Sequence, residues 1–266
     1  LGIKKNDKVA VICNNRPEWN MLDMAIMQVG AITVPIYPTI SREDYLYIIN
    51  DCEVKLVVLE GQSVLQKIES VKDDTPSLTS IYTVKTKSDH PTFEQLVEIG
   101  KNNPNPEELK NREDNVDEKD CATIIYTSGT TGNPKGAMIT HGNFNWMAIT
   151  AAVTNQLVPS DRVLCVLPLF HAYAKLQGFL CPIAHGATIY LEERFHPVET
   201  LKAIAEHKIT VYLGVPTMYA MFAQVPLLEQ LDFSSLRIAG TGGASLPAGV
   251  LHKINQSMGV DMAEGY

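Results

Sequence analysis

The chain has 266 residues, of which 45% are hydrophobic, and it carries 30 acidic side chains against 22 basic ones. This hydrophobic content excludes a disordered chain, and the net charge of −8 argues against a protein that binds along nucleic-acid phosphates. The length is sufficient for one large α/β domain or two smaller lobes with substantial cores.

The most apolar stretch, at 21–37, is interrupted by Asp23 and Gln28. It predicts a core helix running into a strand, because a membrane span needs about 20 consecutive apolar residues. The five cysteines include no CxxC pair, which favours free thiols in a reducing compartment over a disulfide framework or a zinc site. The sequence therefore favours a cytoplasmic protein without a transmembrane segment. Peripheral membrane association and the oligomeric state stay open.

Strands and helices alternate along the chain. The sequence predicts helices over 42–50 and 197–207, where apolar residues recur at helical spacing, and an exposed loop or irregular helix over the charged run 101–120. Short β-rich runs predict strands at 8–13, 54–60, 79–84, 122–128, 163–169, 186–193, 209–215 and 236–243. This alternation predicts an α/β fold with layered, largely parallel sheets flanked by helices. We expect two lobes, 1–158 and 159–266.

The segment YTSGTTGNPKG, residues 126–136, combines three glycines with four hydroxyl side chains and Lys135. Glycines let backbone N–H groups converge on an anion, hydroxyls add neutral donors, and a lysine suits a polyphosphate. An ordinary turn has a similar composition, but this many donors directly after a buried strand favours phosphate binding. The spacing matches neither the P-loop nor the dinucleotide-binding glycine pattern.

All eleven positions of this segment resemble the signature of the adenylate-forming superfamily, which includes acyl-CoA synthetases, aryl-CoA ligases, luciferases and peptide-synthetase adenylation domains. Further similar segments follow in the family's order, and two precede it: NRPEW (15–19), VPIYPT (34–39), PLFHAYA (168–174), GVPTMY (214–219), GTGGAS (240–245) and AEGY (263–266). The chain is most like a long-chain fatty acyl-CoA synthetase. It departs from the usual pattern at Ala174, where glycine is usual, and at Ser245, where proline is common.

The resemblance implies roles for individual residues. His171 and Lys135 would be catalytic, and Thr127 would also lie close to a magnesium ion. The nucleotide would be bound by Thr127, Ser128, Gly129, Thr130, Thr131, Gly132, Lys135, Gly136, Gly242, Gly243, Ala244, Glu264, Gly265 and Tyr266. The substrate pocket would include His171, Ala172, Ala174, Gly178, Val215, Pro216 and Thr217. Without the resemblance, His171 would be read as an ordinary histidine and Gly242–Gly243 as a turn after a strand.

The implied reaction joins a carboxylic acid to ATP as an acyl-adenylate, releases pyrophosphate, and transfers the acyl group to coenzyme A, with Mg²⁺ as a cofactor. A fatty acid is the leading substrate class and an aryl acid the alternative. Amino acids are disfavoured, because FHAYA lacks the aspartate with which peptide-synthetase relatives hold an amino group. A non-catalytic nucleotide-binding module and an unrelated phosphate-binding α/β enzyme are the other candidates.

The resemblance also implies that several family features lie outside residues 1–266. These are the usual first segment, the magnesium-binding glutamate, the ribose-binding aspartate and the small C-terminal domain with its lysine. We therefore expect the fold of the large N-terminal domain of an adenylate-forming enzyme, truncated at both ends. We expect these residues alone not to complete the adenylation reaction.

Overall fold

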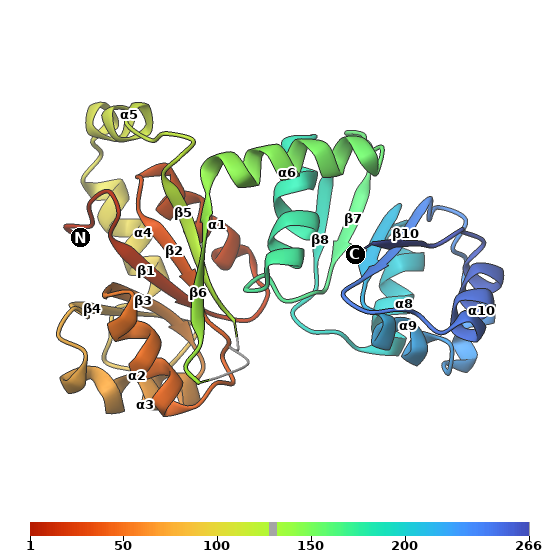
Figure 1. Cartoon of the computed structure of the whole chain (residues 1–266), viewed down its shortest axis with the longest axis horizontal. Coiled ribbons are helices and arrows are strands. Elements are labelled where there is room, and N and C mark those ends of the chain that lie inside the picture. The colour runs from red at the N-terminus through yellow and green to blue at the C-terminus, as the bar shows by residue number, and fades with distance from the viewer. Residues whose placement is uncertain (128–131, 266) are drawn as a thin grey trace. The chain divides into compact units, whose positions relative to one another are not determined.

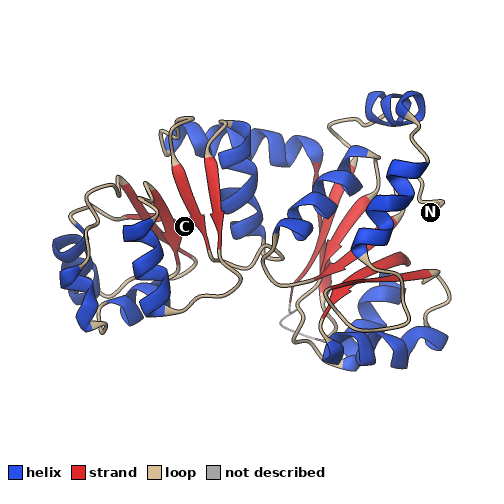
Figure 2. Ribbon diagram, turned by 180° about the vertical axis from the view of Figure 1, so that it is seen from behind, coloured by secondary structure: helices blue, strands red, loops and turns tan. Residues whose placement is uncertain are grey.

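The computed structural model describes residues 1–127 and 132–265. They form two compact units, Leu1–Asn145 (unit 1) and Trp146–Tyr266 (unit 2), traced from red to blue in Figure 1. Each unit contains one β-sheet with helices packed against it, which confirms the layered α/β fold (Figure 2). The division falls within helix α6 (His141–Thr154), whereas the sequence suggested a division at 158.

Unit 1 contains a six-stranded sheet in the order β4-β3-β1-β2-β5-β6. All its neighbours are parallel except β5 and β6, which pair antiparallel. Its elements are β1 (Lys8–Ile12), α1 (Pro17–Gln28), β2 (Ile32–Pro35), α2 (Arg42–Asp51), β3 (Val54–Glu60), α3 (Gln62–Val71), the 3₁₀ turn η1 (Lys72–Asp74), β4 (Ser80–Val84), α4 (Phe93–Asn102), α5 (Pro106–Asp114), β5 (Cys121–Thr127) and β6 (Lys135–Thr140). The stretch at 21–37 is thus a helix followed by a strand, as predicted.

Residue alternation assigns the two faces of the unit 1 sheet to different helices. Val57 and Leu59 of β3 share a core with Tyr45 and Ile49 of α2 and with residues of α3. The continuous apolar character of β1 and β3 arises because helices cover both sheet faces. Helix α2 begins with a capping box in which Ser41 and Asp44 satisfy each other's backbone N–H groups.

Unit 2 contains a five-stranded sheet in the order β11-β10-β9-β7-β8, and every neighbouring pair is parallel. Its elements are β7 (Arg162–Cys165), the π-helix η2 (Ala174–Leu180), α7 (Cys181–Ala184), β8 (Thr188–Leu191), α8 (Pro197–Glu206), β9 (Val211–Gly214), α9 (Pro216–Phe222), the 3₁₀ turn η3 (Pro226–Gln230), β10 (Ile238–Gly242), α10 (Ala248–Met258) and β11 (Ala263–Gly265). Leu164 and Tyr212 face a core completed by α8, α9 and α10. Val163 and Val211 face the opposite core, which includes Cys181 of α7.

Four of the five cysteines are buried and all five are free thiols, as the sequence predicted. In the described part of the chain, no helix combines the length and the apolar character needed to span a membrane. The charged run at 101–120 contains the exposed helix α5.

Candidate active site

The glycine-rich segment connects the two strands of a β-hairpin. β5 and β6 pair antiparallel, with Thr127 opposite Lys135 and Tyr126 opposite Gly136. The sequence predicted the first strand but not β6. The second strand is mostly exposed at the edge of the sheet, and its residues KGAMIT lack a clear hydrophobic alternation. The hairpin brings the two ends of the predicted phosphate-binding loop side by side.

Ser128, Gly129, Thr130 and Thr131 lie outside the described residues. Gly132 has a φ of +96°, a backbone conformation that L side chains rarely adopt, so this position requires glycine. The backbone conformation therefore explains the glycine at 132 without reference to any ligand.

Thr127 and Lys135 present polar groups at the base of the loop. Both residues are exposed, and Lys135 forms no ion pair with any described residue. An ammonium that has no ion pair among the described residues, beside an exposed hydroxyl, is suited to binding an anion. At position 136 packing favours glycine, because an added Cβ atom would lie 2.8 Å from Cγ2 of Ile124.

In unit 2, the predicted site residues follow the carboxyl ends of the parallel strands. His171 comes after β7, Val215 directly follows β9, and Gly243 directly follows β10. The chain runs from β7 to β8 on one side and then returns to β9 on the other side of β7. Ligands of open α/β sheets bind at such a change of direction, at the carboxyl ends of the strands. The topology therefore favours a site near the ends of β7 and β9.

His171 is exposed and its ring is held by the turn that follows it. The backbone N–H of Tyr173 donates to Nδ1 of His171 at 3.2 Å, and the His171 N–H donates to the Pro168 carbonyl at 2.9 Å. Because Nδ1 accepts a hydrogen bond, Nε2 is the ring nitrogen left to act on a ligand.

The structure brings the histidine segment and the glycine-rich end of β10 together. A Cβ atom at Gly242 would lie 3.6 Å from the Tyr173 hydroxyl oxygen and 3.3 Å from the Gly265 carbonyl oxygen. Gly265 pairs with Gly242 in the β10–β11 register. Sequence reasoning did not assign Tyr173 to the site, although its place two residues after His171 was a signal. Burial raises the pKa of Tyr173, so its hydroxyl stays protonated near neutral pH.

The remaining residues of the predicted adenine site also occupy the ends of β10 and β11. Gly243 has a φ of +83°, and Ala244 is exposed. The Glu264 carboxylate accepts the Leu246 backbone N–H at 2.7 Å, which joins β11 to the turn after β10. Tyr266 lies outside the described residues.

The predicted acid-pocket residues are divided between the π-helix and the start of α9. Ala174 and Gly178 are buried in the π-helix, and Gly178 packs directly on Cys165 of β7. Ala172 precedes that helix and is half-buried. Val215 directly precedes α9, Pro216 is the first residue of that helix, and Thr217 is exposed. π-Helical turns are frequent at functional sites, which is consistent with a ligand near this segment.

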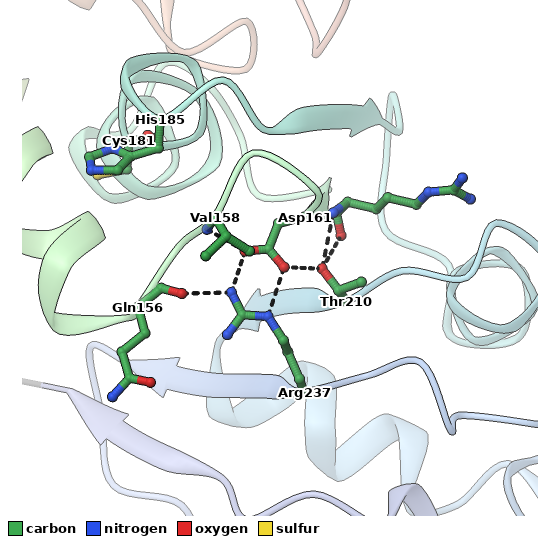
Figure 3. A network of polar contacts seen from close by, with 8 residues as sticks. Gln156, Val158, Asp161, Cys181, His185, Thr210 and Arg237 are labelled. Atoms are coloured by element: carbon green, nitrogen blue, oxygen red, sulfur yellow. Dashed lines mark hydrogen bonds and ion pairs between the residues drawn. The ribbon is translucent and has the colours of Figure 1, made fainter.

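At the amino ends of the unit 2 strands, opposite the predicted site, a polar network centred on Asp161 joins neighbouring strands (Figure 3). Asp161 Oδ1 accepts from Thr210 Oγ1 at 2.6 Å and from Arg237 Nε at 2.7 Å. Its Oδ2 accepts from the Val158 N–H at 2.8 Å and forms an ion pair with Arg237. Asp161, Thr210 and Arg237 each directly precede a strand, so the network fixes the amino ends of β7, β9 and β10.

The described part of the chain contains no evident binding site for a magnesium ion. No group of three or more His, Cys, Asp or Glu residues there is arranged to hold a metal ion. Mg²⁺ is usually bound by one or two carboxylates together with substrate phosphates. Thr127 supplies only a hydroxyl, so the described residues do not by themselves fit the metal.

Comparison with known proteins identifies the family. The AMP-binding enzyme family matches residues 1–266, the whole chain. The chain belongs to this family. The match covers both the hairpin of unit 1 and the strand ends of unit 2, which contain the segments that pointed to adenylate formation.

Similar curated proteins of the AMP-binding family are CoA ligases acting on different acids. The chain is 30% identical over 265 residues to a feruloyl-CoA synthase of Amycolatopsis sp, and 30% identical over 286 residues to a long-chain-fatty-acid–CoA ligase of Bacillus subtilis (strain 168). Each alignment covers 100% of this chain, but 50% and 51% of the respective relative. The chain therefore spans about half the length of these relatives.

A solved structure supports the same fold. The inhibitor-bound N-terminal domain of FACL13 from Mycobacterium tuberculosis matches with a TM-score of 0.84 and 27% identity, covering 100% of this chain and 63% of that one. The fold is thus that of the N-terminal domain of an adenylate-forming enzyme, as predicted from the sequence.

Proposed function

We propose that this AMP-binding protein contributes to ATP-dependent activation of a carboxylic acid and its transfer to coenzyme A. The observation that carries the proposal is the family match over the whole chain, and both curated relatives described above are a CoA ligase or a CoA synthase. The distribution of the motif residues supports it, because they gather at a hairpin loop and at strand carboxyl ends suited to nucleotide binding.

In the first step, a carboxylate oxygen attacks the α-phosphorus of ATP. A bond forms between these atoms, the bond from the α-phosphorus to the bridging oxygen breaks, and pyrophosphate leaves. Lys135, Thr127 and the loop between them would bind the β- and γ-phosphates and neutralise the charge on the leaving pyrophosphate. Such phosphoryl chemistry depends on positioning and charge stabilisation rather than on a protein nucleophile.

The residues of unit 2 would bind the adenosine and acyl parts. Gly242, Gly243 and Ala244 would lie along the adenine together with the Glu264–Tyr266 segment, and His171 Nε2 would orient the carboxylate. Ala172, Ala174, Gly178 and the Val215–Thr217 segment would border the acyl group. In the second step the coenzyme A sulfur attacks the acyl carbon, and the bond to AMP breaks.

A fatty acid is our leading substrate. It is supported by the likeness to the fatty-acid–CoA ligase and by the apolar, small-residue character of the segment after His171. An aryl acid is the second candidate, because the feruloyl-CoA synthase is equally similar at 30% identity. A narrow, flat pocket would favour the aryl acid and a deep one the fatty acid.

Carboxylate-dependent exchange between pyrophosphate and ATP tests the proposal. A longer protein, in which residues 1–266 form part of a chain of the relatives' full length, should catalyse exchange with a medium- or long-chain fatty acid and form the acyl-CoA product. Exchange with ferulate or benzoate alone would replace the fatty acid by an aryl acid. No exchange with fatty, aryl or amino acids, or release of ADP without any carboxylate, would refute acid activation. We expect residues 1–266 alone to show no exchange.

A further inference from the structure

We infer that Asp51, at the end of α2, is a positioning residue that holds the phosphate-binding hairpin through the Tyr126 hydroxyl. The inference rests on the proposed function for its effect on ATP use. Its structural basis is the hydrogen bond that Tyr126 Oη donates to Asp51 Oδ2 at 2.6 Å. This bond joins residues 75 positions apart in the sequence, one in a helix and one in the strand that leads into the loop.

Tyr126 lies where its position controls both ends of the loop. It is the residue before Thr127 in β5, and it pairs directly with Gly136, the residue after Lys135. An added Cβ at Gly136 would lie 3.1 Å from Cζ of Tyr126, so the ring passes close over the β6 backbone. Glycine at 136 therefore leaves room for the Tyr126 ring beside the β6 backbone.

The Tyr126 ring is fixed on its other sides by the core of unit 1. The residue is only 8% exposed and belongs to the cluster that includes Ile49 of α2 and Ile124 of β5. Burial and the hydrogen bond to Asp51 raise the pKa of Tyr126, so the phenol remains a donor throughout the neutral range. Packing holds the ring, and the hydrogen bond from its hydroxyl to Asp51 then holds the end of β5 in place.

The position of Asp51 in its helix does not favour a negative charge. It is the last residue of α2, where a negative charge is disfavoured by the helix dipole, and no basic residue lies in that turn. Its carboxylate accepts from Tyr126 at Oδ2 and from Tyr47 at Oδ1, the latter at 3.3 Å. Asp51 thus accepts one hydrogen bond from the hairpin and one from its own helix, which provides a matched control.

The test compares Tyr126→Phe, Asp51→Ala and Asp51→Asn with Tyr47→Phe in the longer protein. Tyr47→Phe removes a phenol hydrogen bond to the same carboxylate without touching the hairpin. We expect Tyr126→Phe and Asp51→Ala to lower kcat/KM for ATP by roughly three- to tenfold, a modest loss because Asp51 is exposed. The KM for the carboxylic acid should stay unchanged. The kcat/KM of Asp51→Asn for ATP should lie between those of wild type and Asp51→Ala, since the amide oxygen still accepts a hydrogen bond from Tyr126.

Two further results separate positioning from a general loss of stability. The double variant Tyr126→Phe with Asp51→Ala should be no worse than Asp51→Ala alone, because both changes remove the same bond between the hairpin and α2. Tryptic cleavage after Lys135 without ligand should be faster in Tyr126→Phe and Asp51→Ala than in wild type or Tyr47→Phe, because the strand ends open more often. This cleavage needs no enzymatic activity.

These readouts distinguish the inference from the proposed function. If wild type shows no exchange with any acid, the proposed function fails, and the cleavage rates alone decide the inference. If Tyr126→Phe matches Tyr47→Phe in both cleavage and kcat/KM for ATP, the inference is overturned. The inference is equally overturned if all variants, including Tyr47→Phe, lose kcat/KM for both the acid and ATP and also unfold at a lower temperature.

Discussion

Gly178 lies so close to Cys165 that a Cβ atom at position 178 would come 2.5 Å from the Cys165 sulfur. Gly178 belongs to the π-helix that follows His171, and Cys165 ends β7. Both residues are buried. The helix that borders the proposed acyl pocket therefore depends on the absence of a side chain at 178 for its approach to the sheet.

Gly178→Ala should destabilise the protein by about 1–3 kcal/mol, the usual range for added volume in a packed core. Urea unfolding measures the change. Cys165→Ala removes the sulfur, after which the nearest contact would be the Cβ atom of residue 165 at 3.2 Å. The double variant should therefore be more stable than the sum of the two single effects predicts. Equal stability of Gly178→Ala and wild type would contradict this packing.

Gly243 should be sensitive to substitution for a different reason. Nothing lies within 4 Å of a Cβ atom added there, but its φ of +83° is strained for any L residue. Gly243→Ala should cost about 1–2 kcal/mol of stability and raise the KM for ATP if the turn binds adenine. Gly249→Ala is the matched control.

Gly249 also has open space around it, but it lies in helix α10 and its φ is not positive. Alanine there should be neutral or stabilise by up to about 1 kcal/mol. If both alanine variants behave alike in urea unfolding and in ATP kinetics, the conformation of Gly243 has no special importance.

The sequence was sufficient to predict the α/β layers, since buried strands such as 54–60 are continuously apolar and helices such as 197–207 are periodic. It could not predict the edge strand β6, whose exposed residues carry no periodic signal. Nor could it predict contacts between distant segments, such as Tyr173 with Gly242 or Asp51 with Tyr126. Those contacts depend on strand order, and strand order is not encoded in any local pattern.

The Asp161 network predicts a pH-dependent contribution to stability. Burial opposes ionisation of Asp161, but hydrogen bonds from Arg237, Thr210 and the Val158 N–H outweigh it and hold its pKa below the ordinary value. A lowered pKa in the folded state adds stability above the unfolded pKa, near 4, and this stability is lost as the pH falls through the folded value.

Asp161→Asn should therefore be less stable than wild type by about 2 kcal/mol at pH 7, since it leaves Arg237 without its charged partner. The difference should remain constant down to about pH 4 and narrow below it. Urea unfolding between pH 3 and pH 7 measures this. Asp232→Asn, which removes an exposed ion pair with Lys208, should have little effect at any pH. A difference for Asp161→Asn that does not change with pH would contradict the role of its charge.

Lys135 gives the most direct test of the phosphate-binding hairpin. Because it is exposed and forms no ion pair within the described residues, Lys135→Gln should leave the unfolding transition unchanged. Activity should respond strongly, because removing a cation that stabilises a developing negative charge typically costs on the order of a hundredfold in rate.

Lys87→Gln is the control, since Lys87 is also exposed and lies outside the proposed site. Measured by pyrophosphate exchange in the longer protein, Lys87→Gln should match wild type, and Lys135→Gln should lose most of its activity at saturating acid. The loss should be partly hidden at high ionic strength, where salt already screens the wild-type attraction for ATP. A Lys135→Gln protein that folds normally and exchanges like Lys87→Gln would mean that the loop binds phosphate through its backbone and hydroxyl groups alone.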